Sequence, residues 1–125
     1  MDKFEPIHKH LIVSSVCDNP PSTVEDTNEF LQDLVEAVGM KVIAGPTSVM
    51  VEEEGNEGPT GTIVGTITLA TSHAAIHSWT VTGRVEWCLY SCKEFNPQDA
   101  LNVFSRFNPN EINWKLIDRD KLNKI

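Results

Sequence analysis

One short segment concentrates the side chains that could do chemistry. Residues 71–79 read Thr-Ser-His-Ala-Ala-Ile-His-Ser-Trp, and Cys92 follows downstream. A serine, a histidine and a cysteine that converge can support acid–base and covalent chemistry, because histidine titrates near neutral pH and a thiol can deliver a proton or attack as thiolate. By spacing alone a structural role remains open for each of them, since small buried thiols often serve packing. Spacing alone does not choose among the serines and histidines of this segment.

The two histidines of this segment, His73 and His77, do not predict a metal site. On a helix they would lie one turn apart, but in a strand residues i and i+4 lie roughly 13 Å apart on the same face. The neighbouring isoleucine, threonines and valine favour a strand. We therefore expect no metal here.

The pattern of apolar residues and turn formers along the chain predicts an α+β fold. Runs rich in β-branched residues, bounded by turn formers, predict strands. We expect them at 10–16, 40–44, 62–70, 73–79, 84–91 and 112–116. The charged run at 52–59 indicates a flexible, solvated loop, with cation attraction as the less favoured interpretation.

Two helices complete the expected fold. Ser22 with Glu25 fits a capping box, and the helix that follows has an apolar stripe ending before Gly39. Asn96-Pro97 predicts the start of the second helix, because asparagine caps a helix and proline suits its first position. The order β-α-β-β-β-β-α-β predicts a two-layer sandwich, an antiparallel-type sheet with both helices on one face.

Composition limits the class of protein. The chain has 125 residues and a formal net charge of -8, which favours one domain over 1–125 and disfavours nucleic acid or an anionic membrane as partner. Apolar runs such as 63–70 are shorter than the roughly 20 residues that span a bilayer. Three cysteines without a CxxC pair suit a cytoplasmic location. A chain of this size leaves sheet surface uncovered, so we expect a homodimer.

The segment Ser72-His73-Ala74-Ala75-Ile76-His77-Ser78-Trp79, followed by Cys92, resembles a segment of the small prokaryotic S-adenosylmethionine decarboxylases. That family carries Ser-His-x-x-Ile-His-Thr-Trp and a downstream Thr-Cys. The serine, the histidine five residues later and the cysteine twenty residues after the serine match together. The opening strand at 9–13, the element order and the size are also similar. The resemblance thus extends over most of the chain.

The resemblance implies a self-processing, pyruvoyl-dependent decarboxylase of spermidine biosynthesis. In that family the serine hydroxyl attacks the preceding carbonyl, and β-elimination from the resulting ester leads to a pyruvoyl group. Here the cut would fall between Thr71 and Ser72, and the covalent pyruvoyl cofactor would derive from Ser72. His77 matches the residue that removes a proton during processing, and Cys92 matches the proton donor in turnover.

The resemblance also implies how the enzyme meets its substrate. A small amino-acid substrate, S-adenosylmethionine in the family, forms a Schiff base with the pyruvoyl carbonyl, which then acts as an electron sink. The active sites lie near the interface of a dimer whose sheets face each other. The sequence assigns no substrate-binding residue.

Several positions depart from the family pattern and leave two alternatives open. Thr71 stands where the family has glutamate, Thr80-Val81 replaces Pro-Glu, and 45–61 lacks an aromatic residue. A pyruvoyl enzyme for ornithine or arginine is one alternative, favoured by Glu52 to Glu54 and Glu57. The other is a homologue that does not process and acts as a binding or regulatory subunit.

Overall fold

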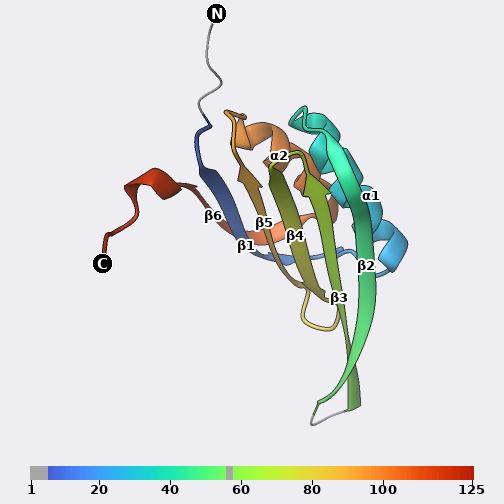
Figure 1. The fold of residues 1–125 in the computed structure, drawn as a ribbon. Coiled ribbons are helices and arrows are strands. Elements are labelled where there is room, and N and C mark those ends of the chain that lie inside the picture. The colour runs from blue at the N-terminus through green and yellow to red at the C-terminus, as the bar shows by residue number, and fades with distance from the viewer. Residues whose placement is uncertain (1–5, 56–57) are drawn as a thin grey trace, which may run out of the picture.

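The computed structural model describes residues 6–55 and 58–125 (Figure 1). The strands are β1 (Lys9–Cys17), β2 (Val42–Gly55), β3 (Gly58–Leu69), β4 (Ser72–Trp79), β5 (Arg84–Ser91) and β6 (Pro109–Asp118). The helices are α1 (Val24–Ala37) and α2 (Pro97–Phe104), with short 3-10 turns η1 (Ser105–Phe107) and η2 (Arg119–Lys121). This is the predicted order of strands and helices.

The six strands form one antiparallel sheet in the order β2-β3-β4-β5-β1-β6. Both helices pack on the same face, so that the other face of the sheet is not covered by any described element (Figure 1). The predicted α+β sandwich is therefore confirmed. Strand β4, which carries the candidate serine and histidine, lies in the interior of the sheet between β3 and β5.

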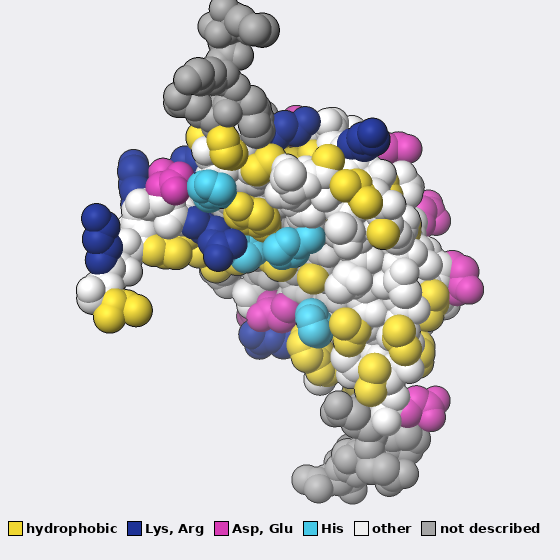
Figure 2. Space-filling model, in the orientation of Figure 1, with side chains coloured by type: hydrophobic (Ala, Val, Ile, Leu, Met, Phe, Trp, Pro, Cys, Tyr) yellow, Lys and Arg dark blue, Asp and Glu magenta, His cyan; other side chains and the backbone are white. Residues whose placement is uncertain are grey.

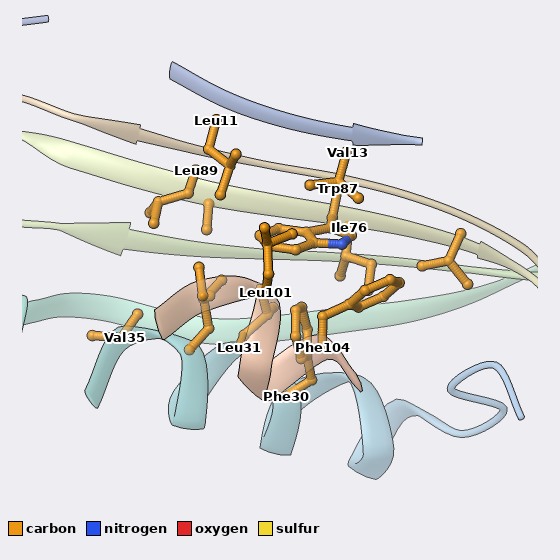
Figure 3. Packing of buried hydrophobic residues seen from close by; sticks show 14 of the residues in the cluster. Leu11, Val13, Phe30, Leu31, Val35, Ile76, Trp87, Leu89, Leu101 and Phe104 are labelled. Carbon is orange, nitrogen blue, oxygen red and sulfur yellow. The ribbon is translucent and has the colours of Figure 1, made fainter. Parts of the chain in front are cut away.

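The core fills the space between the sheet and the helices (Figure 3). Phe30 of α1 lies with its ring 5.5 Å from the ring of Trp87 on β5 and 5.8 Å from that of Phe104 on α2. All three side chains are buried, and aromatic pairs in edge-on geometry add stability beyond their buried area. This packing ties β5 firmly to both helices.

The first helix begins one residue later than predicted. Thr23, not Ser22, is the N-cap, and its Oγ1 accepts a hydrogen bond of 3.0 Å from the backbone N–H of Asp26. The Ser22 hydroxyl instead donates to the carbonyl of Pro20. Both residues have an acidic residue three positions later, so the local capping signal fits either start. The second helix begins as predicted, with Asn96 as N-cap and Pro97 first.

The predicted loop at 52–59 is wrong wherever the structure describes it. Residues 52–55 continue β2, residues 58 and 59 begin β3, and their ladder runs from Glu52 paired with Gly61 to Gly55 paired with Gly58. Residues 56 and 57 lie outside the described residues. Because β2 is an edge strand, a charged residue such as the exposed Glu52 can remain in water without breaking the ladder. The ladder of β2 with β3 shifts register between Ala44 and Thr47, the stretch that contains Gly45-Pro46.

Candidate active site

Strand β4 divides the candidate residues between the two faces of the sheet. Its burial alternates, with Ser72 and Ser78 buried on the helix face and His73 and His77 exposed on the uncovered face. Successive side chains of a strand point to opposite faces, so a spacing of five separates Ser72 from His77. Along the strand the two residues are also about 16 Å apart. Within one protomer the structure does not bring them together.

The residue before Ser72 has an unusual backbone conformation. Ala70 and Thr71 form the two-residue turn between β3 and β4, in which Leu69 pairs with Ser72. Thr71 has a φ of 60°, a left-handed conformation that suits glycine or asparagine and is strained for a β-branched residue. Such strain costs roughly 1–3 kcal/mol and is often found at functional sites. It lies at the peptide bond that the resemblance marks for cleavage.

Ser72 and Cys92 are brought together by strand pairing, because β5 ends beside the start of β4. The backbone N–H of Cys92 donates to Ser72 Oγ over 3.2 Å. Both side chains are buried, at 8% and 7% exposed. A donor directed at this oxygen stabilises negative charge that develops on it when the hydroxyl loses its proton.

The Cys92 thiol also meets the Thr71 hydroxyl. Thr71 Oγ1 lies 2.6 Å from Cys92 Sγ and 2.6 Å from the carbonyl oxygen of Ala70, to which it donates. A hydroxyl has one hydrogen, so an oxygen that donates to Ala70 accepts from the thiol. This arrangement holds the Cys92 thiol against the turn that precedes Ser72.

Lys93, which follows Cys92, does not turn toward the thiol. Its ammonium donates to the carbonyl oxygen of Gly39 over 3.0 Å, just beyond the end of α1. The contact satisfies a carbonyl near a helix C-terminus, where a cation is also favoured by the helix dipole. Lys93 therefore stabilises the loop after β5.

His77 faces a hollow on the uncovered face of the sheet. The hollow has a volume of about 480 Å³, and its lining includes Ala75, His77, Glu86 and Cys88. Glu86 is the cross-strand partner of His77, and the ring of Trp79 stacks on the imidazole at 5.9 Å. Glu86 Oε2 is buried without a hydrogen-bond partner in the described part of the chain. Glu86 could not be predicted from the sequence, because its pairing with His77 depends on the register of β5 against β4.

The other two cysteines occupy different surroundings. Cys17 lies in the core, where burial raises the pKa of its thiol. Cys88 is partly buried and lines the hollow on the uncovered face, and burial raises the pKa of its thiol as well. Both thiols are therefore held in the neutral form at physiological pH.

The acidic run lies far from Ser72. Glu52 pairs with Gly61, whereas Ser72 pairs with Leu69, eight positions further along β3. At about 3.3 Å per residue the separation is about 26 Å, so the run does not face a substrate at Ser72 of the same protomer. Glu57 lies outside the described residues.

Neither helix in the described part of the chain has the length and hydrophobicity needed to span a bilayer. In the same part of the chain, no group of three or more His, Cys, Asp or Glu side chains is arranged to hold a metal ion.

Comparison with known proteins identifies a family and a solved structure of similar fold. The family described as S-adenosylmethionine decarboxylase matches residues 9–120. The fold is similar to the crystal structure of the adenosylmethionine decarboxylase from Aquifex aeolicus VF5, with a TM-score of 0.68 and 19% sequence identity over 98% of each chain. A search of curated proteins finds no match. At this identity the structural likeness supports the fold, and the match over 9–120 carries the relationship.

Proposed function

Since the chain belongs to the S-adenosylmethionine decarboxylase family, we propose that it is a self-processing, pyruvoyl-dependent carboxy-lyase that acts on S-adenosylmethionine. Its product would serve spermidine biosynthesis in the cytoplasm. The observation that carries the proposal is the strained Thr71 next to the buried pair Ser72 and Cys92. These residues fit the cofactor, because the pyruvoyl precursor is Ser72 itself.

Processing begins at the Thr71–Ser72 peptide. Ser72 Oγ forms a bond to the Thr71 carbonyl carbon, the C–N bond breaks, and the freed amine takes the hydroxyl proton, leaving an ester. Loss of the Ser72 α-proton then breaks the Cβ–O bond, so that Thr71 leaves as a carboxylate and residue 72 becomes dehydroalanine. Water converts this residue to the pyruvoyl group and releases ammonia. The N–H of Cys92 supports the first step by stabilising charge on Ser72 Oγ.

A pyruvoyl group derived from Ser72 would supply a sink for the electrons left behind when carbon dioxide departs in turnover. The contribution of this chain is to hold a proton close by. Cys92 Sγ, which contacts the Thr71 hydroxyl in the turn before residue 72, is the proposed donor to the decarboxylated carbon. Its burial keeps bulk water from competing as a proton source.

His77 requires a second copy of the chain for the role proposed in processing. In one protomer it lies on the face opposite to Ser72. That face is the uncovered one, which a homodimer with facing sheets would cover. The Thr71–Ser72 peptide lies in the turn between β3 and β4, at one end of the sheet. We therefore propose that His77 of the partner protomer reaches this peptide.

Mixing two inactive variants tests this assignment. We expect Ser72→Ala and His77→Ala to remain uncleaved when each is produced alone. When they are produced together, the His77→Ala chain should be cleaved, because the Ser72→Ala partner supplies the imidazole. Intact-mass spectrometry distinguishes the chains, and His73→Ala serves as the control histidine on the same face. Cleavage of His77→Ala by itself would remove His77 from the processing reaction.

Strain at Thr71 predicts an effect on the rate of cleavage. Thr71→Gly relieves the left-handed strain, and we expect cleavage to slow roughly five- to tenfold, which corresponds to about 1 kcal/mol less ground-state strain. Thr71→Ala keeps most of the strain but lacks the hydroxyl, so it separates the two contributions.

Asn108→Gly is the matched control for strain, because Asn108 also has a positive φ, of 50°, and lies outside the site. It should leave the cleavage rate unchanged. The rates are read as the loss of intact chain over time. Equal rates for wild type and Thr71→Gly would show that strain does not drive processing.

An assay of carbon dioxide release identifies the substrate. Cleaved protein should release it from S-adenosylmethionine but not from ornithine or arginine, since the acidic run that favoured a basic substrate lies about 26 Å from Ser72 along the sheet. Release from arginine or ornithine alone would replace the proposed substrate. Inactivity on all three would favour the second candidate function, a non-processing subunit. That candidate is supported by the lack of a basic side chain at Ser72 Oγ among its described hydrogen-bond contacts.

A further inference from the structure

A cluster of basic and aromatic side chains lies on the uncovered face near the Ser72 end of the sheet. It consists of His8, His10, His73, Tyr90 and Arg119. His73 and His10 are both cross-strand partners of Tyr90, which joins β4, β5 and β1 in one patch. Figure 2 shows histidine and basic side chains gathered on this part of the face. The patch contrasts with a chain whose net charge is -8.

Tyr90 organises the cluster. Its hydroxyl lies 2.6 Å from His8 Nδ1, and the guanidinium carbon of Arg119 lies over its ring at 5.0 Å. The His73 ring is 5.5 Å from the Tyr90 ring and 6.3 Å from the His10 ring. A cation over an aromatic face is held in place by the ring, so the guanidinium is oriented before any ligand arrives.

A pocket of about 310 Å³ opens beside this arrangement. Its lining is His8, Tyr90, Arg119, Asp120 and Leu122. In the described part of the chain, Arg119 forms no ion pair, whereas its acidic neighbour Asp118 pairs with Lys9 at 3.2 Å. The pocket thus presents a planar, permanently charged donor group that no described carboxylate neutralises.

The surroundings of the pocket also contain a polar atom without a partner. His10 Nε2 is buried and has no hydrogen-bond partner among the described residues. Burial, followed by the charge of Arg119 and then that of His73, lowers the pKa of His10. A bound anion near Arg119 would offset the positive charge that opposes protonation of His10. This electrostatic gain would favour binding of the anion.

We propose that the pocket formed by His8, Tyr90 and Arg119 binds an oxyanion, the carboxylate or phosphate group of a small ligand. Arg119 supplies a fork of parallel N–H donors, which matches two oxygens of either group. The Tyr90 hydroxyl and the His8 ring supply further polar contacts at the wall. Asp120 opposes binding from the rim, so the anion lies on the Arg119 side of the pocket.

Titration with inorganic phosphate and with acetate tests the proposal. The full chain is titrated with each sodium salt at constant pH and ionic strength, with chloride as the balancing anion. We expect saturable NMR shifts of the His8 and Tyr90 ring signals at millimolar concentration. Arg119→Gln should weaken binding by about tenfold, because a bidentate charge-assisted contact is lost. Asp120→Asn should tighten it by about threefold, because a repelling charge is removed.

Two control variants test whether the loss of affinity is specific to the Arg119 guanidinium. Lys115→Gln removes one positive charge from the same chain end without altering the pocket, and should leave the affinity unchanged. Arg119→Lys keeps the charge but not the fork, and should fall between wild type and Arg119→Gln. Binding of phosphate alone or of acetate alone would identify the group, and binding of both would support a general oxyanion site.

Shifts that never saturate with either salt would overturn the proposal. So would an equal loss of affinity in Lys115→Gln, which would indicate general surface charge. The titration is repeated on Ser72→Ala, where the same affinity is expected. The oxyanion site is therefore tested independently of self-processing.

Discussion

Ser72→Ala is expected to remain a single chain of about 13.9 kDa and to release no carbon dioxide from S-adenosylmethionine. Alanine has no hydroxyl to attack the Thr71 carbonyl, so neither the ester nor the pyruvoyl group can form. The fold should survive, because the Ser72 side chain accepts a hydrogen bond from the Cys92 N–H, and the removal of such a contact costs roughly 1–3 kcal/mol. Intact-mass spectrometry and a carbon dioxide assay measure the two effects.

Ser78→Ala is the matched control for this variant. Ser78 lies on the same strand and the same buried face, and its hydroxyl donates to the carbonyl of Pro21 over 2.8 Å. The variant loses a buried hydroxyl without touching the turn, so cleavage should proceed as in wild type. If Ser72→Ala were cleaved at the same place as wild type, Ser72 could not be the nucleophile.

Cys92→Ala is expected to separate processing from turnover. Cleavage uses Ser72 and the Thr71 carbonyl, and the Cys92 N–H remains in the variant, so two chains should still form. Decarboxylation should fall by roughly a hundredfold or more, because the positioned proton donor is lost. Parallel measurement of cleavage and of carbon dioxide release on the same sample checks both parts.

Cys88→Ala provides the comparison for the thiol. Cys88 lies on β5, which ends one residue before Cys92, and it lines the hollow on the uncovered face. It should retain both cleavage and turnover. A Cys92→Ala enzyme with full activity would exclude the thiol as the proton source, and equal losses in both cysteine variants would point to a general effect on folding.

Most of the fold could be predicted from the sequence, because helix caps and apolar patterns depend on residues that are close together in the chain. The start of α2 required only Asn96 and Pro97, and the buried stripe of α1 followed from its spacing. The start of α1 was displaced by one residue because Ser22 and Thr23 offer competing caps. The pairing of β2 with β3 was not predicted, because the charged run at 52–59 favours a loop, whereas an edge strand tolerates charge.

The family resemblance is confirmed, but the geometry of the site needed the register of the strands. Ser72 and Cys92 meet because the end of β5 lies beside the start of β4, which spacing alone does not state. The separation of Ser72 from His77 follows from an odd spacing within a strand. The strain at Thr71 was not predicted, since a strand at 62–70 left the turn undefined. The basic cluster around Tyr90 was not predicted, because its members come from β1 and the residue before it, β4, β5 and η2.

The mass of the purified wild-type protein shows whether the chain processes itself at Ser72. Self-processing at Ser72 predicts two chains, residues 1–71 and residues 72–125, the second with a pyruvoyl group in place of its first residue and therefore resistant to N-terminal sequencing. Ser78→Ala should give the same two masses, and Ser72→Ala should give one. A wild-type protein that remains a single intact chain of about 13.9 kDa, after prolonged incubation as a folded dimer, would contradict the proposal.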